Sequence, residues 1–440
     1  MMKKPLHEDI VKASHFMLGE NKNFSDLTPN QKYLRFIGLR RLGLTFYCLN
    51  ILSKKKPSEL IISVIAIAIA LIDKKRYASH VIVSQSVEAL KLICGRKTAG
   101  FGNFLLRKIM TDFESLSKKN ASHCSKWNAP NWWIGHFKKQ CISKRIQNTF
   151  LESIDAHPPL TIRVNDLREI ESISREFDHL NKTLIKVGPR AYTVIPPFNI
   201  LKTEAFKGGK ISVQDSSSQL ISTLLQPCEE SKVLDMCAAP GGKSLALATL
   251  HRFNLISNDK SGERMKKMKT EIVRLKNYLV TTPLTCSFDP LDQVGLMELQ
   301  NYCENGFDYI LLDAPCSASG LLRRHPEIPW VRTPSQLKNL ILLQAKLLDA
   351  SWTILRTGGI LIYSTCSIFY NEGENQILKF LRRTKDAERK SAPGLIEPKI
   401  GIDLYEKPLT CIDKKNIRKD WLGNDGFFYA ILKKRTKWEK

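Results

Sequence analysis

Two cysteines follow strongly apolar runs of this sequence, and their chemistry gives the first hypotheses about function. Cys316 follows FDYILLDAP, and Cys366 follows ILIYST. A single cysteine is more often a small buried residue than a nucleophile. A thiolate, however, is a strong nucleophile where a nearby cation or a helix N-terminus favours its formation. Two cysteines at one site would therefore indicate chemistry rather than packing.

A third motif, VLDMCAAPGGKS from Val233 to Ser244, joins an apolar run to a loop of small residues. Such a loop lets a ligand approach backbone amides where a helix begins. A Walker A loop would need glycine at the position of Cys237, so a phosphate-binding loop is the less favoured alternative. We favour an adenosyl cofactor, because Asp259 lies about 20 residues beyond the glycines and could accept both ribose hydroxyls.

One reaction that a thiolate could assist beside an adenosyl cofactor is the methylation of a pyrimidine. When a thiolate adds to carbon 6 of cytosine, carbon 5 becomes able to attack an electrophilic methyl group. A buried carboxyl group such as Asp313 could stabilise charge at ring nitrogen 3 during this addition. A base must then remove the proton from carbon 5, which gives a second cysteine a role. The spacing of Cys316 and Cys366 does not decide which of them attacks.

The elements that would position these residues are those of a parallel α/β sheet. In a doubly wound sheet, ligands bind outside the carboxyl ends of the strands, so the three motifs should share one crevice. The long helix that begins after Thr333 is expected to end at Gly358-Gly359. The apolar runs predict strands at 232–236, 255–258, 307–313, 360–364 and 427–432.

Charge separates the first third of the chain from the rest. The 440 residues include 68 Lys and Arg against 43 Asp and Glu, a net charge of +25, and residues 1–150 hold 26 of the basic residues and nine of the acidic ones. Apolar residues at helical spacing predict an all-α domain there, with a buried helix near 60–72 that is too short to span a membrane. The charge favours a nucleic-acid partner, and a merely solvated basic surface is the alternative.

The cysteine pattern indicates the compartment. The eleven cysteines are irregularly spaced, and no two stand as CxxC, so we expect neither a disulfide framework nor a metal site. The first residues lack the apolar run of a signal peptide. We therefore expect a cytoplasmic protein without a membrane partner.

The motifs resemble those of the RsmB (Sun/Fmu) family of 16S rRNA cytosine-5 methyltransferases, within the NOL/NSUN group. CAAPGGK, DAPC and TCS are all present, and VQDSSSQL and NDGFFYAILKK match further family segments. The resemblance implies a Rossmann-like class I S-adenosylmethionine-dependent methyltransferase domain preceded by an all-α NusB-like domain. On this basis we expect the NusB-like domain at 1–145, a linker and small subdomain at 146–205, and the methyltransferase domain at 206–440.

The same resemblance implies roles for individual residues. Cys366 would be the nucleophile, and Cys316 would assist proton removal; the reverse remains open, because other cytosine methyltransferases attack with a cysteine that follows proline. Asp313 would contribute to both catalysis and cofactor binding. The cofactor S-adenosyl-L-methionine would be held by Cys237, Ala238, Ala239, Pro240, Gly241, Gly242, Lys243, Asp259, Arg264, Asp289 and Asp313.

The expected partner is 16S rRNA, free or in an early small-subunit particle, bound by a monomeric enzyme. Transfer RNA is an alternative substrate, and a non-catalytic ribosome-assembly factor is an alternative function. Phosphate contacts are expected from Lys243, Arg323, Arg324, Arg40 and Arg41.

Overall fold

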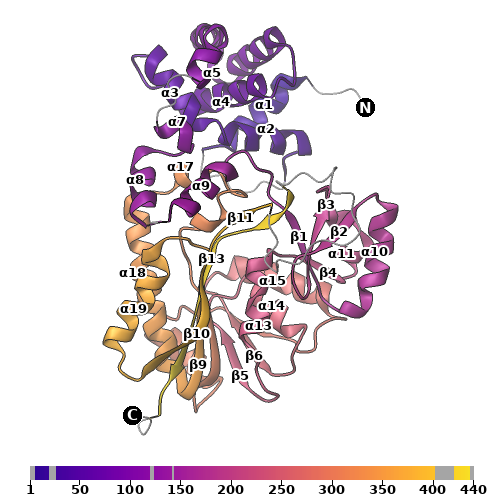
Figure 1. Cartoon of the computed structure of the whole chain (residues 1–440), viewed down its shortest axis with the longest axis vertical. Helices are drawn as coiled ribbons and strands as arrows, with labels where there is room; N and C mark the ends of the chain where they lie inside the picture. The colour runs from indigo at the N-terminus through magenta and orange to yellow at the C-terminus, as the bar shows by residue number, and fades with distance from the viewer. Residues whose placement is uncertain (1–4, 19–25, 119–122, 141–142, 402–420, 437–440) are drawn as a thin grey trace. The chain divides into compact units, whose positions relative to one another are not determined.

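The computed structural model describes residues 5–18, 26–118, 123–140, 143–401 and 421–436 (Figure 1). The chain divides into two compact units. The first, called here the helical unit, comprises Met1–Ile142, Phe150–Asp155 and Leu322–Pro334. The second, called here the α/β unit, comprises Ser143–Thr149, Ala156–Leu321 and Ser335–Lys440.

Nine helices precede the first strand in the described part of the chain. They are α1 (Leu6–His15), α2 (Pro29–Leu39), α3 (Leu42–Leu52), α4 (Glu59–Asp73), α5 (Ser79–Thr111), α6 (Phe113–Lys118), α7 (His123–Trp127), α8 (Asn131–Gln140) and α9 (Lys144–Ser153). Thr28 begins α2 with a complete capping box, and Gly95, at φ +80°, kinks α5. These helices confirm the all-α prediction and extend it past residue 145.

Helix α4 is the centre of the helical unit. Every residue from Ile61 to Leu71 is buried, and a helix that is apolar on all sides is stable only when its neighbours surround it. Helices α1, α2, α3 and α5 supply most of the rest of this core. The predicted buried helix is therefore confirmed. Among the described helices, none is long and apolar enough to cross a membrane.

One segment that we assigned to the methyltransferase domain lies in the helical unit instead. Leu322–Pro334, which contains α17 (Ile328–Val331), follows the strand that carries Asp313. Arg35 of α2 pairs with Glu327 at 3.3 Å, and Phe46 of α3 stacks on Trp330 with ring centroids 5.0 Å apart. A buried ion pair and an aromatic contact thus hold this segment against α2 and α3.

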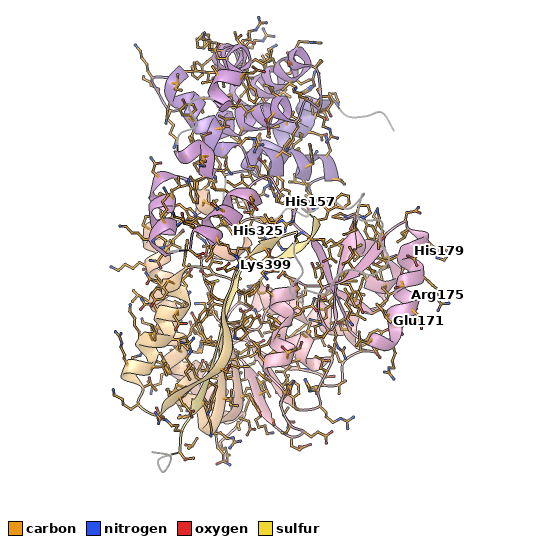
Figure 2. The ribbon with its side chains drawn as sticks, in the orientation of Figure 1. His157, Glu171, Arg175, His179, His325 and Lys399 are labelled. Carbon is orange, nitrogen blue, oxygen red and sulfur yellow. The ribbon has the colours of Figure 1, made fainter. Side chains whose placement is uncertain are left out.

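The α/β unit begins with a small antiparallel sheet. Its strands are β1 (Leu160–Val164), β2 (Thr183–Lys186), β3 (Ala191–Ile195) and β4 (Ile211–Val213), in the order β2-β3-β1-β4. Ile173 and Phe177 of α10 (Ile170–His179) pack against it, whereas Glu171, Arg175 and His179 lie on the outer side of the helix (Figure 2). Because β4 pairs with β1, this subdomain runs past the expected boundary at residue 205.

The larger sheet has seven strands in the order β10-β13-β9-β8-β5-β6-β7. Adjacent strands from β9 to β7 are parallel, and β13 is antiparallel to both β9 and β10. The strands are β5 (Lys232–Asp235), β6 (Asn254–Asn258), β7 (Leu284–Cys286), β8 (Phe307–Asp313), β9 (Leu355–Thr365), β10 (Ala387–Ile396) and β13 (Phe427–Lys434), beside a ribbon of β11 (Lys399–Ile400) and β12 (Gly423–Asn424).

Helices cover both faces of this sheet, as the apolar strands predicted. One face packs on α16, α18 and α19 through residues such as Ile310 and Tyr363, and the other packs on α13 and α14 through Leu311 and Ile362. The helices of this unit not yet given are α11 (Glu204–Lys207), α12 (Ser216–Gln219), α13 (Ile221–Leu224), α14 (Gly242–Ala248), α15 (Gly262–Leu275), α16 (Gln293–Asn301), α18 (Pro334–Ile354) and α19 (Glu374–Arg383).

The predicted end of the long helix is wrong. Helix α18 ends at Ile354 and β9 begins at the next residue, so Gly358 and Gly359 lie within the strand. Gly358 adopts φ +80°, and the pairing of β9 with β8 shifts register nearby, between Phe307 and Tyr309. The glycines accommodate this irregularity instead of ending the helix.

Candidate active site

The carboxyl ends of the five parallel strands bring the sequence motifs to one edge of the sheet. Asp313 at the end of β8 lies opposite Ser364 of β9, and Asn258 at the end of β6 lies opposite Cys286 of β7. The motif residues stand at these strand ends or in the loops that follow them. The motifs therefore lie at one edge of the sheet, as the parallel topology predicted, and their sharing of one ligand crevice stays a prediction.

The two cysteines of the motifs are in contact. Their sulfur atoms are 3.3 Å apart, and the amide of Gly320 donates to the carbonyl of Cys366 at 3.0 Å, which joins the two loops. The hydrogen bond with Cys366, followed by burial, raises the pKa of Cys316 well above its ordinary value. Because adjacent thiolates repel each other, ionisation of one thiol disfavours ionisation of the other. The pair can therefore supply one nucleophilic thiolate beside one protonated thiol.

Asp313 is held by two partners at the same edge. Its Oδ2 lies 2.6 Å from Nζ of Lys243, and its Oδ1 accepts a hydrogen bond from the Ser364 hydroxyl at 2.8 Å. The Lys243 side chain is only 7% exposed, and its ammonium lies 5.1 Å from the centre of the Phe427 ring. These contacts fix the orientation of the carboxylate. They also engage the ammonium group for which we expected an RNA contact.

The packing around the CAAPGGK loop explains why its residues are small. Gly241 adopts φ +104°, and a Cβ there would lie 2.9 Å from Met268. The amide of Ala238 donates to the carbonyl of Asn258 at 2.8 Å, which holds the loop against the end of β6. A Cβ on Gly242 would meet only Gln214, at 3.7 Å. The loop is therefore closely packed on one side and open near Gly242.

Asp259 is placed to accept hydroxyl groups. It is 3% exposed, its Oδ1 accepts the amide of Ser261 at 2.9 Å, and its Oδ2 lies 3.1 Å from Nη1 of Arg264. Arg264 also donates to the carbonyl of Ala239, so it ties the acid to the glycine loop. Oδ2 has no hydrogen bond of good geometry within the described chain, and a carboxylate can accept several. This donor and acceptor set fits the ribose of an adenosyl group.

Asp289 lies in the loop after β7, next to the end of β6. The amide of Asp259 donates to the carbonyl of Cys286 at 3.3 Å. The Asp289 carboxylate accepts the amide of Leu291 at 3.0 Å and lies 3.8 Å from Lys260. It therefore shares an edge with Asp259, and its contact with the cofactor stays a prediction.

Two arginines that we expected on RNA make contacts within the helical unit instead. Arg40 donates to the carbonyl of Arg323 at 2.8 Å, and burial lowers the pKa of Arg40 to about 10. Arg41 pairs with Asp73 and with Asp155, each at 2.6 Å. Both guanidinium groups therefore hold protein segments together, which argues against the expected phosphate contacts.

The basic residues after the Cys316 loop differ in exposure. Arg323 is 5% exposed, and its expected contact with RNA stays a prediction. Arg324 is half-buried, and its contact with RNA stays a prediction. His325 lies at the surface of the helical unit (Figure 2), where its Nδ1 is 3.3 Å from Glu327.

Sequence reasoning missed a buried carboxylate behind the two cysteine loops. Glu372 is 1% exposed and accepts hydrogen bonds from Ser317 and Ser367, the residues that follow the two cysteines. Gln344 of α18 donates to it as well. The two serines that directly follow the cysteines were an available signal, because buried hydroxyl groups need hydrogen-bond acceptors.

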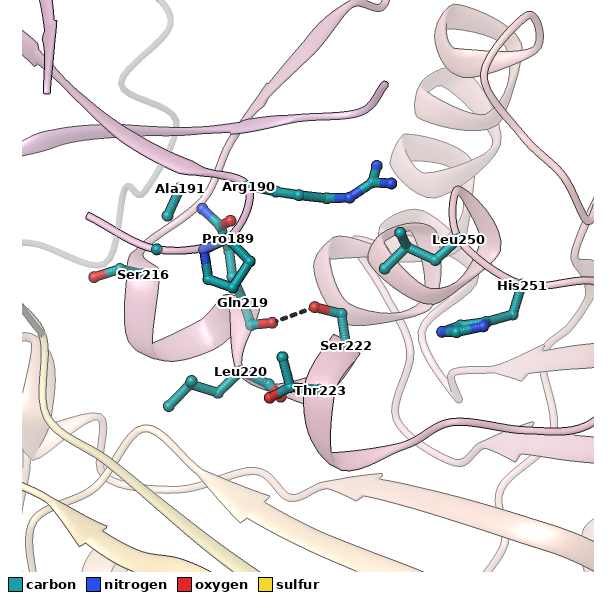
Figure 3. A pocket seen from close by; sticks show the side chains of 11 residues that line it. Pro189, Arg190, Ala191, Ser216, Gln219, Leu220, Ser222, Thr223, Leu250 and His251 are labelled. Carbon is teal, nitrogen blue, oxygen red and sulfur yellow. Dashed lines mark hydrogen bonds between the residues drawn. The ribbon is translucent and has the colours of Figure 1, made fainter. Parts of the chain in front are cut away.

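A separate cavity of about 180 Å³ lies in the α/β unit (Figure 3). It is formed by the connection between β2 and β3, by α12 and α13, and by residues that follow α14, including Leu250 and His251. None of its lining residues belongs to the predicted site. The glycine loop precedes α14, whereas Leu250 and His251 follow it. The cavity therefore lies at the other end of that helix from the glycine loop.

Comparison with solved structures defines the class of this fold. PH0851 matches 98% of this chain, and 99% of its own length, with a TM-score of 0.75 at 22% identity. A methyltransferase homologue from Pyrococcus horikoshii matches 69% of this chain, and 95% of its own, with a TM-score of 0.53 at 26% identity. The sheet, the glycine loop and the acidic strand ends are those of a Rossmann-like S-adenosylmethionine-dependent methyltransferase.

Sequence comparison identifies the family. The protein-family model described as 16S rRNA methyltransferase RsmB/F matches residues 222–433. The ribosomal RNA small subunit methyltransferase B of Pasteurella multocida is 31% identical over 369 residues, covering 82% of this chain and 77% of the relative. The protein of the same description from Serratia proteamaculans is 30% identical over 371 residues, covering 81% and 78%. The chain belongs to the RsmB/F family of 16S rRNA methyltransferases.

Proposed function

We propose that this protein methylates carbon 5 of a specific cytosine in 16S rRNA through a covalent cysteine–cytosine adduct. The observation that carries the proposal is the 3.3 Å contact between the sulfur atoms of Cys316 and Cys366. Membership of the RsmB/F family supports the rRNA substrate. Paired thiols support carbon 5 as the target, because methylation of oxygen or nitrogen needs no thiol nucleophile.

Residues at the strand ends would hold the cofactor. Asp259, tied to the 237–243 loop by Arg264, would accept the ribose hydroxyls, and Asp289 would lie near the adenine. S-adenosylmethionine supplies an electrophilic methyl group when bound. The open side of the loop at Gly242 leaves room for this ligand beside the Lys243–Asp313 ion pair.

Cys366 would act as the nucleophile. Its thiolate forms a bond with carbon 6 of the cytosine, and carbon 5 then takes the methyl group. Cys316 would first release its thiol proton to solvent and then accept the proton from carbon 5. The bond between carbon 6 and sulfur would break, returning the electron pair to Cys366, as ring nitrogen 3 gives up the proton it gained and the ring regains its aromatic electrons. The raised pKa of Cys316 favours this division of labour, because a thiol of high pKa is the poorer starting nucleophile and its thiolate the stronger base.

Asp313 would orient the base. Because the carboxylate is paired with Lys243, we expect it to accept hydrogen bonds rather than to donate a proton. The amino group of cytosine, and ring nitrogen 3 when it is protonated during addition, are the donors available to it. This refines our expectation of a carboxyl group that stabilises charge at nitrogen 3.

Exposed cations of the helical unit would contact RNA phosphates in place of Arg40 and Arg41. Residues 54–56 and 74–76 form two basic clusters at the two ends of α4, and all six side chains are exposed. Arg76 lies over the Tyr33 ring at 4.5 Å. Basic residues beside accessible aromatic rings are typical of RNA-binding surfaces.

The proposal predicts opposite effects of the two cysteine substitutions. With S-adenosylmethionine and unmodified 16S rRNA, the wild-type protein should protect one cytosine from bisulfite conversion, and Cys366→Ala should abolish that protection. Cys316→Ala should instead accumulate a protein–RNA adduct stable to denaturing electrophoresis, because the adduct forms but cannot resolve. The Cys316→Ala/Cys366→Ala double variant is the control and should form none.

Other outcomes assign other functions. An adduct retained in Cys366→Ala and lost in Cys316→Ala would reverse the two roles. Methylation of tRNA but not of 16S rRNA would keep the chemistry and reject the substrate. Absence of S-adenosylmethionine binding in calorimetry would contradict the enzyme and favour a non-catalytic assembly factor.

A further inference from the structure

A buried carboxylate connects the two cysteine loops. Oε1 of Glu372 accepts the amide of Ser317 at 2.8 Å and the side-chain amide of Gln344 at 3.0 Å. Its Oε2 lies 2.5 Å from the Ser317 hydroxyl and 2.6 Å from the Ser367 hydroxyl. Ser317 follows Cys316 and Ser367 follows Cys366 in the sequence. One carboxylate therefore holds the residue after each thiol.

The protons of this network have a single consistent arrangement. The Ser317 and Ser367 hydroxyls, 3.3 Å apart, both donate to Glu372. The Ser319 hydroxyl, 2.8 Å from that of Ser367, must then donate to it, and it accepts the amide of Ile368 at 3.0 Å. Each hydroxyl thus has one acceptor for its proton, and the carboxylate is the final acceptor of the network.

The backbone beside Glu372 makes further contacts with both loops. Its carbonyl accepts the hydroxyl of Tyr363, which lies on the strand leading to Cys366, at 2.7 Å. Gln344 donates to the carbonyl of Pro315, the residue before Cys316, at 2.9 Å. Glu372 and Gln344 together therefore contact residues on both sides of the cysteine pair.

Burying a carboxylate among neutral donors is costly. Ser317, Ser367 and Gln344 carry no charge, so no ion pair with them offsets the desolvation of Glu372. A glutamine would fill the same space without that cost, but its amide would place two donors where two hydroxyls already donate. A side chain with two acceptor oxygens and no amide donor is therefore the group that lets both serine hydroxyls donate inward at once.

We propose that Glu372 is a positioning residue that holds the Cys316 and Cys366 loops together and so sets the contact between the two thiols. The catalytic importance of Glu372 rests on the proposed function, because the covalent adduct resolves only if Cys316 reaches the proton on carbon 5. Glu372 acts on the thiols through its hydrogen bonds with Ser317 and Ser367.

The test measures the distance between the thiols without using methyl transfer. Diamide accepts two electrons and two protons from a pair of nearby thiols, which become a disulfide. In the full-length protein, mass spectrometry should find the Cys316–Cys366 disulfide in the wild type, with Cys316→Ala as the blank. We expect Glu372→Gln to form it at least about tenfold more slowly, because disulfide geometry tolerates little displacement.

Glu374→Gln is the matched control. Glu374 lies two residues further along and pairs with Arg389 instead of the cysteine loops, so its variant should pair the thiols at the wild-type rate. In turnover, Glu372→Gln should lower kcat by about 100-fold and increase the trapped adduct, while the Kd for S-adenosylmethionine stays within about twofold. A purely structural defect would weaken cofactor binding and would not increase the adduct.

A wild-type disulfide rate in folded Glu372→Gln would overturn the proposal. If that variant does not fold, Ser367→Ala removes one donor and leaves the carboxylate, and a wild-type rate there would overturn the proposal equally. If the rates differ as expected but no variant or wild-type protein methylates RNA, the positioning role stands and the proposed function fails.

Discussion

Asp235, the last residue of β5, is an ionisable group whose titration should be visible in the stability of the protein. It is 1% exposed, its Oδ2 accepts the Ser244 hydroxyl at 2.5 Å, and burial raises its pKa to about 7. In an unfolded chain, an aspartate loses its proton near about pH 3.9. Between about pH 4 and 7, the folded state therefore binds more protons than the unfolded state. Within this window the free energy of unfolding falls as pH rises, and above it this contribution is constant.

The variant Asp235→Asn isolates this effect, because asparagine keeps the shape and does not titrate. From pH 5 to pH 7, the stability of the wild type relative to the variant should fall, by up to about 1.4 kcal/mol per pH unit. Urea unfolding of both proteins at pH 5, 6, 7 and 8 measures the difference. A difference independent of pH would show that Asp235 is already ionised in the folded protein at pH 5.

At the scale of residues, the sequence was informative where a motif is local. Cys316, Cys366, Asp313 and Asp259 lie at strand ends that apolar runs reveal, and the parallel topology then brings them to one edge. Glu372 was not predictable in this way. Its partners Ser317 and Gln344 lie 55 and 28 residues away, and no spacing rule connects such distant positions.

At the scale of elements, strands buried on both faces were predicted and edge or half-exposed strands were missed. Strand β8, FDYILLD, has a buried apolar centre from residue 310 to residue 312, whereas β10, AERKSAPGLI, lies at the sheet edge, carries three consecutive charged residues and is buried only at its two ends. The strands of the small antiparallel sheet have three to five residues each, which leaves little periodic signal. The two glycines of β9 were misjudged because a bulge and a helix end use the same residue type.

The segment Leu322–Pro334 leads to a prediction at this scale. Its ion pair joins Arg35 and Glu327, whose side chains are 3% and 14% exposed, so Glu327→Gln would remove a charged partner from a buried guanidinium. We expect the opening free energy of α2, measured by native-state hydrogen exchange, to fall by about 3 kcal/mol. Glu88→Gln breaks an exposed pair with Lys91 and should have a much smaller effect, because solvent screens exposed ion pairs. Equal effects of the two variants would contradict a structural role for Glu327.

At the scale of the whole molecule, the net charge of +25 predicts salt-dependent RNA binding that the helical unit dominates. Lys54, Lys55 and Lys56 are exposed, and Lys56 lies 5.6 Å from the Phe46 ring that stacks on Trp330. RNA held by these lysines would therefore lie beside Leu322–Pro334, the segment that follows the Cys316 loop. Removing one lysine that neutralises a phosphate should reduce the slope of log K against log salt by about 0.7 to 0.9.

Replacing all three lysines by alanine should therefore weaken binding of 16S rRNA and reduce that slope by about 2 to 3 if each neutralises a phosphate. Fluorescence anisotropy at several salt concentrations measures both quantities. Lys266, Lys267 and Lys269 on α15 are also exposed, and their triple alanine variant changes the net charge equally. If both triple variants lower affinity to the same extent, RNA responds to the total charge of the molecule, and the helical unit has no special part in binding.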